Sequence, residues 1–463
     1  MKCNLVFFSI LCVTFMASSV FAQPVLIKKV VQENFSSNLP LVIIDIMKED
    51  RIHGSYKIDA KMKIIEPSEG NRSTMDSQPS YEGLISIKRR GSSSEGFPKK
   101  QYAFKTQTAE GKSDNVSLLG MPHEHKWILN APYSDKTLMR NYLVYHKTRE
   151  INEEKYYAVR SHFVELFFDD GKAYHYQGVY VLMEKIKQNK ERVKIKKLTK
   201  FRKLRITGGY ILKLDKNTTQ GEVLDFKENR QFLYEYPKAD KITTMQKLYI
   251  SSYLRAFQQA LYSDDFNVTS FPHYYGKWID EDAFIVHILS RELFLDADIW
   301  MFSEYIHKDE NQKLFLSTVW DFNLGMGNDN YRFQGNFQQL AYKSFVEGAP
   351  YTLSSWVQRL MSDPSFYAKL HQKWKALRLG IWSNKSFVNF IDETQEYLSE
   401  SANRNYQRWT QNLGKFVWPN RKTCKENGKN IYCKTFESAV EHDLKDWLIH
   451  RLEWMDKALD QET

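Results

Sequence analysis

The sequence predicts an α+β fold in which a β-rich N-terminal part precedes a mainly helical C-terminal part. Short apolar runs separated by Gly, Ser, Asn and Pro clusters fill residues 39–214, and longer segments with helical spacing follow from residue 244. No internal repeat or low-complexity tract interrupts this order. Strands followed by helices are typical of α+β proteins, so we expect a β-rich lobe at 23–240 and a helical lobe at 241–463.

The N-terminus has the features of a secretory signal. One Lys precedes an apolar run at 5–16, and small residues lead to Ala22. The run is short for a membrane span and no basic stop-transfer cluster follows it, so we expect a cleaved signal at 1–22 rather than an anchor. This interpretation predicts a secreted or periplasmic protein with no transmembrane anchor after signal cleavage.

The strands are expected where apolar and β-branched residues alternate or cluster. They are predicted at 41–45, 56–65, 84–88, 102–106, 161–168, 177–185 and 209–214. One helix is predicted among them, at 137–151, packed on the sheet. The later helices are predicted at 244–262, 280–295, 356–379, 385–401 and 438–459.

The net charge of +10 is spread along the chain, with local concentrations at 185–205 and near Arg421. Such a run is usually a solvated face, and it could instead meet an anionic substrate, lipopolysaccharide or nucleic acid. No aromatic interleaving or nucleic-acid motif accompanies it, so we expect no nucleic acid among the partners.

Four cysteines divide into two pairs. Cys3 and Cys12 lie in the predicted signal, whereas Cys424 and Cys433 bracket a turn sequence. In an oxidising compartment the second pair is expected to form a local disulfide across a hairpin.

The segment with the clearest chemistry is a predicted hairpin flanked by acids. Strands are expected at 304–308 and 313–320, with Asp298 and Ser303 before them and Asp321 directly after. Protein kinases place their catalytic base, second metal ligand and principal magnesium ligand in this order. The hairpin therefore predicts phosphoryl transfer, although Asp at strand ends is also a common turn former.

Further segments resemble, in the same order along the chain, the CotH kinase family of secreted or spore-coat proteins. The matching segments are 88–93, 97–102, 127–133, 138–141, 178–185, 208–210, 298–323 and 356–409. The resemblance covers roughly 39–459. It implies an atypical protein-kinase-like fold, with ATP and Mg²⁺ as cofactors and a protein Ser/Thr hydroxyl as the phosphate acceptor.

The resemblance also implies roles for particular residues. Asp298 corresponds to the catalytic aspartate and Asp321 to the metal-binding aspartate. Ser303 stands where a kinase catalytic loop has Asn, so the second metal site is expected to be weak or missing. Asn323 replaces the Gly of the usual Asp-Phe-Gly triplet, which argues against ordinary activation-loop switching.

The phosphate-binding residues are expected on the N-terminal strands. Arg90, Ser92 and Ser93 surround Gly91, which allows close backbone approach, and their side chains can bind phosphate oxygens; the alternative is an ordinary turn. Lys105 is the candidate phosphate lysine, with Glu184 to orient it by an ion pair. Two rival lysines remain open, Lys100 and Lys213.

A helix with Arg140 and Asn141 follows the loop at 127–133. These two residues either brace that loop or line the nucleotide cleft. Four aromatic residues of the matching segments are expected in the core: Trp127, Tyr133, Tyr180 and Tyr210.

Three functions compete on this evidence. The first is a secreted Mg-ATP-dependent protein kinase, and the second is a catalytically degenerate surface or matrix interaction protein that keeps the kinase shape. The third is carbohydrate chemistry by Asp296 and Asp298, but a glycosidase pair must straddle a sugar at about 5 to 9.5 Å, which adjacent acids on one loop rarely do.

Overall fold

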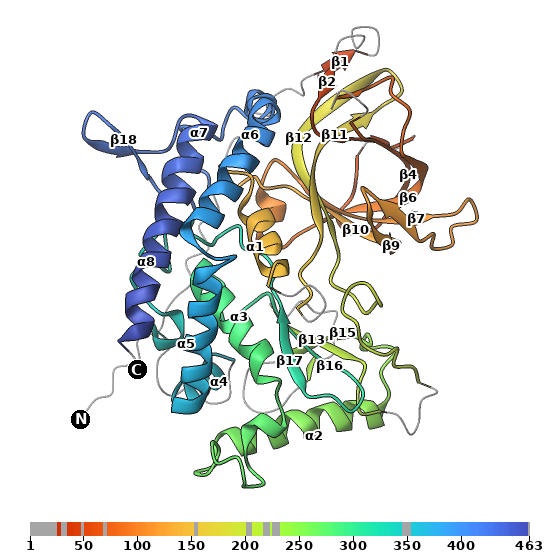
Figure 1. The fold of residues 1–463 in the computed structure, drawn as a ribbon. Helices are drawn as coiled ribbons and strands as arrows, with labels where there is room; N and C mark the ends of the chain where they lie inside the picture. Colours follow the sequence, from red (N-terminus) through yellow and green to blue (C-terminus); the bar gives the residue numbers. More distant parts are fainter. Residues whose placement is uncertain are drawn as a thin grey trace, which may run out of the picture.

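The computed structural model describes residues 26–28, 35–47, 51–67, 72–151, 156–200, 206–215, 223–224, 232–344 and 353–461. The predicted signal at 1–22 lies outside these residues. None of the helices described is both long and apolar enough to cross a membrane. The chain is a mixed α/β protein, with most strands before residue 240 and most helices after it (Figure 1).

Within the described residues, seven strands close into a barrel (Figure 1). They are β3 (Leu41–Asp45), β4 (Ile58–Ile65), β6 (Tyr81–Arg90), β7 (Gln101–Gln107), β10 (Lys126–Asn130), β11 (Ser161–Asp169) and β12 (Ala173–Glu184). Their order is β12-β10-β7-β6-β4-β3-β11, and β11 pairs again with β12. The pairing of β3 with β11 is parallel, with Leu41 opposite Glu165, and β1 (Leu26–Lys28) adds to β12.

The alternation of the strand sequences explains which residues fill the barrel. In β4, Ile58, Ala60 and Met62 are buried, whereas Asp59 and Lys61 between them are exposed. Successive side chains of a strand point to opposite faces, so every second residue joins the core. The predicted strands of this part are confirmed, but their closure into a barrel was not predicted.

A second sheet lies below the barrel in Figure 1. It has the order β14 (Val223–Leu224), β15 (Phe232–Tyr236), β13 (Tyr210–Leu214), β16 (Glu304–Lys308) and β17 (Leu314–Thr318). Its strands come from both sides of residue 240, where the sequence suggested a junction between lobes. The position of that boundary stays a prediction.

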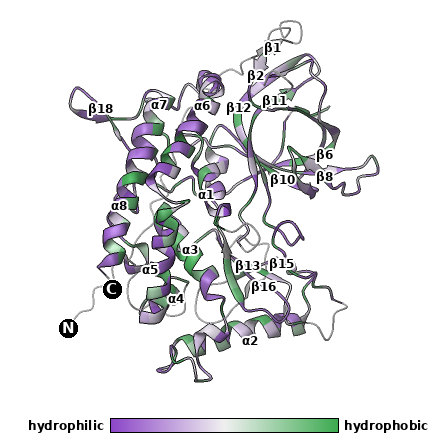
Figure 2. Ribbon diagram, in the orientation of Figure 1, coloured by the Kyte–Doolittle hydropathy of each residue, from purple (hydrophilic) through white to green (hydrophobic). Residues whose placement is uncertain are grey.

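The helices gather beside the two sheets (Figure 1). They are α1 (Arg140–Arg149), α2 (Thr244–Leu261), α3 (Glu281–Phe294), α4 (Leu353–Met361), α5 (Pro364–Leu379), α6 (Asn384–Arg408), α7 (Phe436–Ala439) and α8 (Asp446–Asp460). Helix α3 is buried from Ala283 to Phe294 and appears largely green in Figure 2. It forms the centre of the helical part.

Two helix predictions are corrected. The segment 356–379 is two helices, because Pro364 lacks the N–H that a helix interior needs and Asp363 caps α5 by accepting a hydrogen bond from Ser365 N at 2.9 Å. The segment 438–459 is interrupted by a π-helical turn, η5 (Val440–Lys445).

Short elements complete the fold. They are β2 (Ser36–Ser37), β5 (Ser73–Thr74), β8 (Val116–Leu118), β9 (Met121–Glu124), η2 (Ser93–Gly96), η3 (Tyr275–Lys277), η4 (Ala341–Ser344), β18 (Cys424–Glu426) and β19 (Lys429–Ile431). Strands β18 and β19 pair as a hairpin, and a disulfide joins Cys424 to Cys433. The predicted local disulfide is confirmed.

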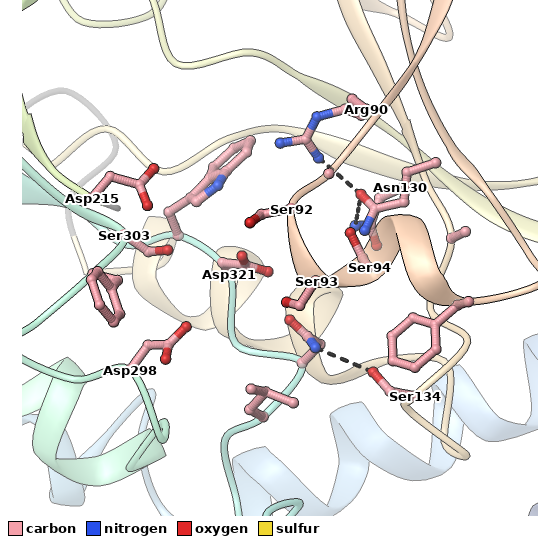
Figure 3. Close-up of a pocket in the computed structure, with 18 of the residues that line it drawn as sticks. Arg90, Ser92, Ser93, Ser94, Asn130, Ser134, Asp215, Asp298, Ser303 and Asp321 are labelled. Atoms are coloured by element: carbon pink, nitrogen blue, oxygen red, sulfur yellow. Dashed lines mark hydrogen bonds between the residues drawn. The ribbon is translucent and has the colours of Figure 1, made fainter. Parts of the chain in front are cut away.

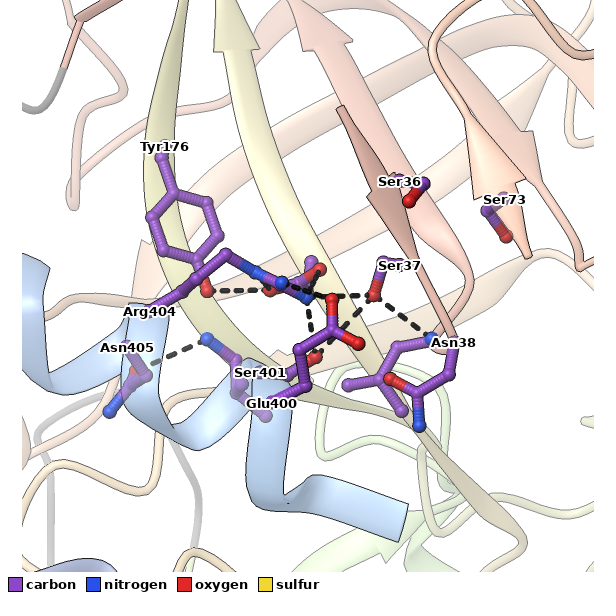
Figure 4. Close-up of polar contacts among 12 residues, drawn as sticks. Ser36, Ser37, Asn38, Ser73, Tyr176, Glu400, Ser401, Arg404 and Asn405 are labelled. Carbon is purple, nitrogen blue, oxygen red and sulfur yellow. Dashed lines mark hydrogen bonds and ion pairs between the residues drawn. The ribbon is translucent and has the colours of Figure 1, made fainter. Parts of the chain in front are cut away.

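Hydrogen bonds and ion pairs of largely buried polar side chains join helix α6 to the barrel (Figure 4). Arg404 donates from Nε and Nη2 to the two carboxylate oxygens of Glu165, both at 3.0 Å. Tyr176 also donates to Glu165, at 2.8 Å, and Glu165 is fully buried. Nearer the surface, Arg72 pairs with Glu400 at 2.7 Å. The barrel and the helices are therefore held together by charge as well as by apolar contact.

Candidate active site

The loop between α3 and β16 carries the first predicted acids. Helix α3 ends at Leu295, which has a left-handed φ of 38°, and Trp300 and Ser303 have φ of 62° and 60°. Such values are uncommon for residues other than glycine and need support from their surroundings. Glu304 supplies part of it by accepting a hydrogen bond from Trp300 N at 3.1 Å.

Glu304 is itself held by two buried side chains of α3. Its carboxylate lies 3.0 Å from Arg291 Nε and 2.8 Å from His287 Nε2, and all three side chains are almost fully buried. A buried carboxylate with such partners is fixed in position. The network thus fixes the start of β16 relative to α3 and constrains the loop between them.

Asp296 and Asp298 have different environments. Asp296 is 1% exposed, and its Oδ1 accepts a hydrogen bond from Asp298 N at 2.7 Å. Burial and the nearby charge of Asp298 raise the pKa of Asp296 well above its ordinary value. Asp298, in contrast, lines a cavity (Figure 3). The loop therefore presents one carboxylate to the cavity, which does not fit a glycosidase pair.

Asp321 follows β17 and is held by α1. It has a left-handed φ of 66°, and its N donates a hydrogen bond to Tyr145 Oη at 3.3 Å. Phe322 N donates to Asn141 Oδ1 at 2.6 Å, and Arg140 Nε donates to Gly325 O at 3.1 Å. One expectation was that Arg140 and Asn141 brace the loop at 127–133. They do brace a loop, but it is the loop that carries Asp321.

The cavity lies between the loop after β6 and the two ends of the β16–β17 hairpin, and its volume is about 300 Å³. Figure 3 shows Asp321 beside Ser92 and Ser93, with Asp215, Ser303 and Asp298 on the opposite side of the view. The predicted residues that line it are Arg90, Ser92, Ser93, Asp298, Ser303 and Asp321, joined by Lys213, Asp215, Asn130, Ser134, Trp320 and Asn323.

The cavity contains groups of both charges. The pKa of Asp321 is raised to about 6. Burial is the largest cause, the charges of Asp298 and Asp215 also raise this pKa, and the charge of Arg90 opposes them. Lys213 Nζ lies 2.8 Å from Asp215 Oδ2. Arg90 donates to Gln101 Oε1 at 2.8 Å, which holds the guanidinium at the edge of the cavity.

The donor set fits a magnesium ion shared with a phosphate ligand. In the part of the chain that the structure describes, no three His, Cys, Asp or Glu side chains converge to hold a metal on their own. Mg²⁺ usually takes one or two carboxylates and completes its shell with water and substrate phosphates. Asp298, Asp321 and Asp215 are the carboxylates that line the cavity, and Ser303 is a nearby hydroxyl. A cation there would relieve the repulsion between Asp321 and the other two acids.

Lys105 and Glu184 lie outside this cavity. Lys105 faces the same side of β7 as Gln101 but lies four residues further along, opposite Lys126 of β10. Glu184 is fully buried and pairs with Arg160 and Arg192, at 3.4 and 3.3 Å. Its ion-pair partners are thus two arginines, and Tyr157 Oη also donates a hydrogen bond to it at 3.0 Å.

Of the rival lysines, Lys213 lines the cavity and Lys100 does not. Lys100 Nζ donates to the backbone oxygen of Glu95 at 2.6 Å. Sequence reasoning missed Asp215, which also lines the cavity. Its signal was present, because it is an acid directly after the strand at 209–214, the same placement that singled out Asp321.

The four aromatic residues predicted in the core are all buried: Trp127, Tyr133, Tyr180 and Tyr210. This confirms the prediction that they are core residues.

A search of curated proteins finds no match to the chain. The family model described as CotH kinase protein matches residues 87–455, which include every residue that lines the cavity. Because the match covers most of the chain, the protein belongs to the CotH kinase family.

Proposed function

We propose that this protein is a protein kinase that transfers the γ-phosphate of ATP to Ser or Thr hydroxyls with Mg²⁺. The observation that carries the proposal is that Asp298, Ser303 and Asp321 line the same cavity as Arg90 and the serines after β6. Kinases bind nucleotide in a cleft between a β-rich and a helical lobe. We propose that this protein has the same two lobes and that the cavity is the nucleotide-binding cleft.

Each cavity residue has a role in this reaction. Asp298 orients the acceptor hydroxyl and takes its proton as the oxygen bonds to the γ-phosphorus and ADP leaves. Asp321 and Ser303 are the residues that would hold Mg²⁺, which supplies charge neutralisation at the phosphates when bound. Arg90 and Lys213 are the cations available to the phosphate oxygens, a role for which Lys105 was the first candidate in the sequence analysis.

Export and a protein acceptor belong to the same proposal. The predicted signal at 1–22 and the disulfide between Cys424 and Cys433 support a secreted or periplasmic protein. ATP is scarce outside the cytoplasm, so such a kinase requires an ATP-bearing compartment at its destination.

A second candidate is a catalytically degenerate protein that serves as a surface or matrix interaction module. It is favoured by two observations: Ser303 stands in place of the usual Asn, and Glu184 pairs with arginines rather than with Lys105. Active protein kinases form an ion pair between a strand lysine and a glutamate. Lys105 and Glu184, which were expected to form it here, do not.

Phosphate transfer and nucleotide binding separate the two candidates. The kinase should phosphorylate a protein acceptor or itself from γ-labelled ATP, and Asp298→Asn should lower the rate by about 10²- to 10⁴-fold. That variant should still show a thermal shift with Mg-ATP, since nucleotide at 100 times its Kd adds about 2.7 kcal/mol of stability. A wild-type protein with neither transfer nor thermal shift at millimolar Mg-ATP would support the interaction module.

The two lysines provide a matched pair of variants. Lys213→Gln should weaken Mg-ATP binding at least about tenfold, because a charged hydrogen bond to phosphate contributes roughly 1.5–3 kcal/mol. Lys105→Gln removes the same charge from the face of β7 outside the cavity and should leave the affinity within about twofold. The reverse pattern would return the phosphate role to Lys105.

A further inference from the structure

A second cavity, of about 500 Å³, is lined by seven lysines. They come from four segments: β10, the residues after β12, the loop before residue 201, and the turn between β15 and α2. The lysines are Lys126, Lys185, Lys187, Lys197, Lys200, Lys238 and Lys241, and Glu235 and Asp240 are the acids that line it. We name this cavity the lysine pocket.

The walls of the lysine pocket are held in place by neutral hydrogen bonds. Tyr236 Oη accepts a hydrogen bond from Leu198 N at 3.1 Å and donates one to Leu198 O at 3.3 Å. Gln246 of α2 donates to Thr199 O at 2.9 Å. Leu198, Tyr236 and Pro237 also give the pocket apolar surface. The loops are therefore joined to each other and to α2 independently of the lysines.

The acids of the pocket do not balance its lysines. Glu235 is shared by Lys185, at 3.3 Å, and Lys238, at 2.9 Å. Lys241 pairs with Asp240 at 3.0 Å. Among the residues described, Lys126 and Lys197 form no ion pair. The pocket keeps a large excess of positive charge in a concave site, where a field is focused.

Lys126 shows the effect of this excess most clearly. Burial, together with the charges of Lys187, Lys185 and Lys105, lowers its pKa to about 8, while Glu124 opposes them. Lys187 is fixed beside it, with Nζ 2.6 Å from Glu124 Oε1. An anion in the pocket would neutralise charges that now repel each other.

The kind of anion follows from the residue types and the size. Within the described residues no arginine lines the pocket. Arginine suits planar, bidentate binding of carboxylates, whereas lysine acts as a point charge suited to phosphate. A volume of about 500 Å³ is that of a small-molecule site rather than a macromolecular groove. We propose that the lysine pocket binds a small molecule that carries several phosphate groups.

This site is separate from the proposed active site and does not depend on kinase activity. None of its lining residues lines the first cavity. The two cavities are nevertheless close enough that the charge of Lys213, in the first, helps to lower the pKa of Glu235, in the second, although burial opposes this and Lys185 and Lys238 contribute more.

The test uses the full mature chain and two probes without divalent metal. Isothermal titration with tripolyphosphate tests an inorganic source of the phosphates, and titration with inositol hexakisphosphate tests an organic one. Binding of either probe is expected, with a Kd raised at least tenfold in Lys126→Gln/Lys197→Gln. A second variant of exposed lysines, K238Q/K241Q, should also raise Kd and serves if the first variant unfolds.

Two controls distinguish binding in the lysine pocket from nonspecific binding to positive charge and from binding in the first cavity. The variant K425Q/K429Q removes two exposed lysines on the β18–β19 hairpin and should leave Kd within twofold. Arg90→Gln should also leave Kd unchanged. The proposal is overturned if neither probe binds, if both pocket variants bind like the wild type, or if Arg90→Gln abolishes binding. It is equally overturned if a Glu-rich peptide binds through these lysines and neither probe does.

Discussion

Replacing Asp321 by Asn should stabilise the protein while abolishing phosphate transfer. In the unfolded chain this carboxyl ionises near its ordinary pKa of 3.8, whereas in the folded chain burial raises the pKa to about 6. The folded state therefore binds more protons between these values, and stability falls as the pH rises through that window. One pKa unit corresponds to about 1.4 kcal/mol, so the loss reaches about 3 kcal/mol at pH 7. This is an upper limit, because part of the side chain is exposed.

Asn is suited to the test because it tolerates the left-handed backbone that Asp321 adopts, with φ of 66°. Urea unfolding of the wild type and Asp321→Asn should give similar stabilities below pH 4 and a gap that opens towards pH 7 in favour of the variant. Transfer from labelled ATP should be lost in the same protein. If the free energies of unfolding of the two proteins changed in the same way with pH, the argument that ionised Asp321 destabilises the folded state would be refuted.

A second buried acid supplies the control. Burial raises the pKa of Asp443 to about 6 as well, but Asp443 does not line the cavity. Asp443→Asn should therefore alter the dependence of stability on pH and leave phosphate transfer in place. Loss of transfer in this variant would mean that transfer depends on the fold in general rather than on the carboxylate that we propose as a metal ligand.

Two further variants test how the structure is held together. Arg404→Ala should cost about 3 kcal/mol in guanidinium unfolding because it leaves the buried Glu165 charge unpaired, whereas Arg72→Ala, at a half-exposed ion pair, should cost less than about 1 kcal/mol; equal losses would contradict this difference. Cys424→Ser/Cys433→Ser removes a disulfide with a sequence separation of 9 and should cost about 2 to 3 kcal/mol, with phosphate transfer unchanged.

The parts of the fold that could be predicted depend on local sequence. The strand at 41–45 was predicted residue for residue, because an apolar run bounded by turn residues needs no knowledge of its partners. The hairpin of β16 and β17 was also predicted, together with Asp298 and Asp321 at its ends. Its turn residues and acids are consecutive in the sequence, so the geometry follows from the local chain.

What could not be predicted depends on the register between distant strands. Lys105 has the right residue type on the right strand, but its pairing with Lys126 places it beyond the cavity. Lys213 reaches the cavity because β13 pairs with β16, with Lys213 opposite Tyr305, which also lines it. Neither register follows from residues 100–106 or 209–214 alone. The same limit applies to the closure of the barrel.

The closed barrel also sets the order in which the chain can fold. The strand β3 has β11 as one of its neighbours, and Leu41 lies opposite Glu165. The sheet cannot close until the ribosome has made the chain as far as Glu184, the end of β12, and contacts so distant in sequence form slowly. A nascent chain of this protein therefore stays incompletely folded for a long part of its synthesis. Such a delay fits the export proposed above, in which the polypeptide would cross a membrane as an extended chain.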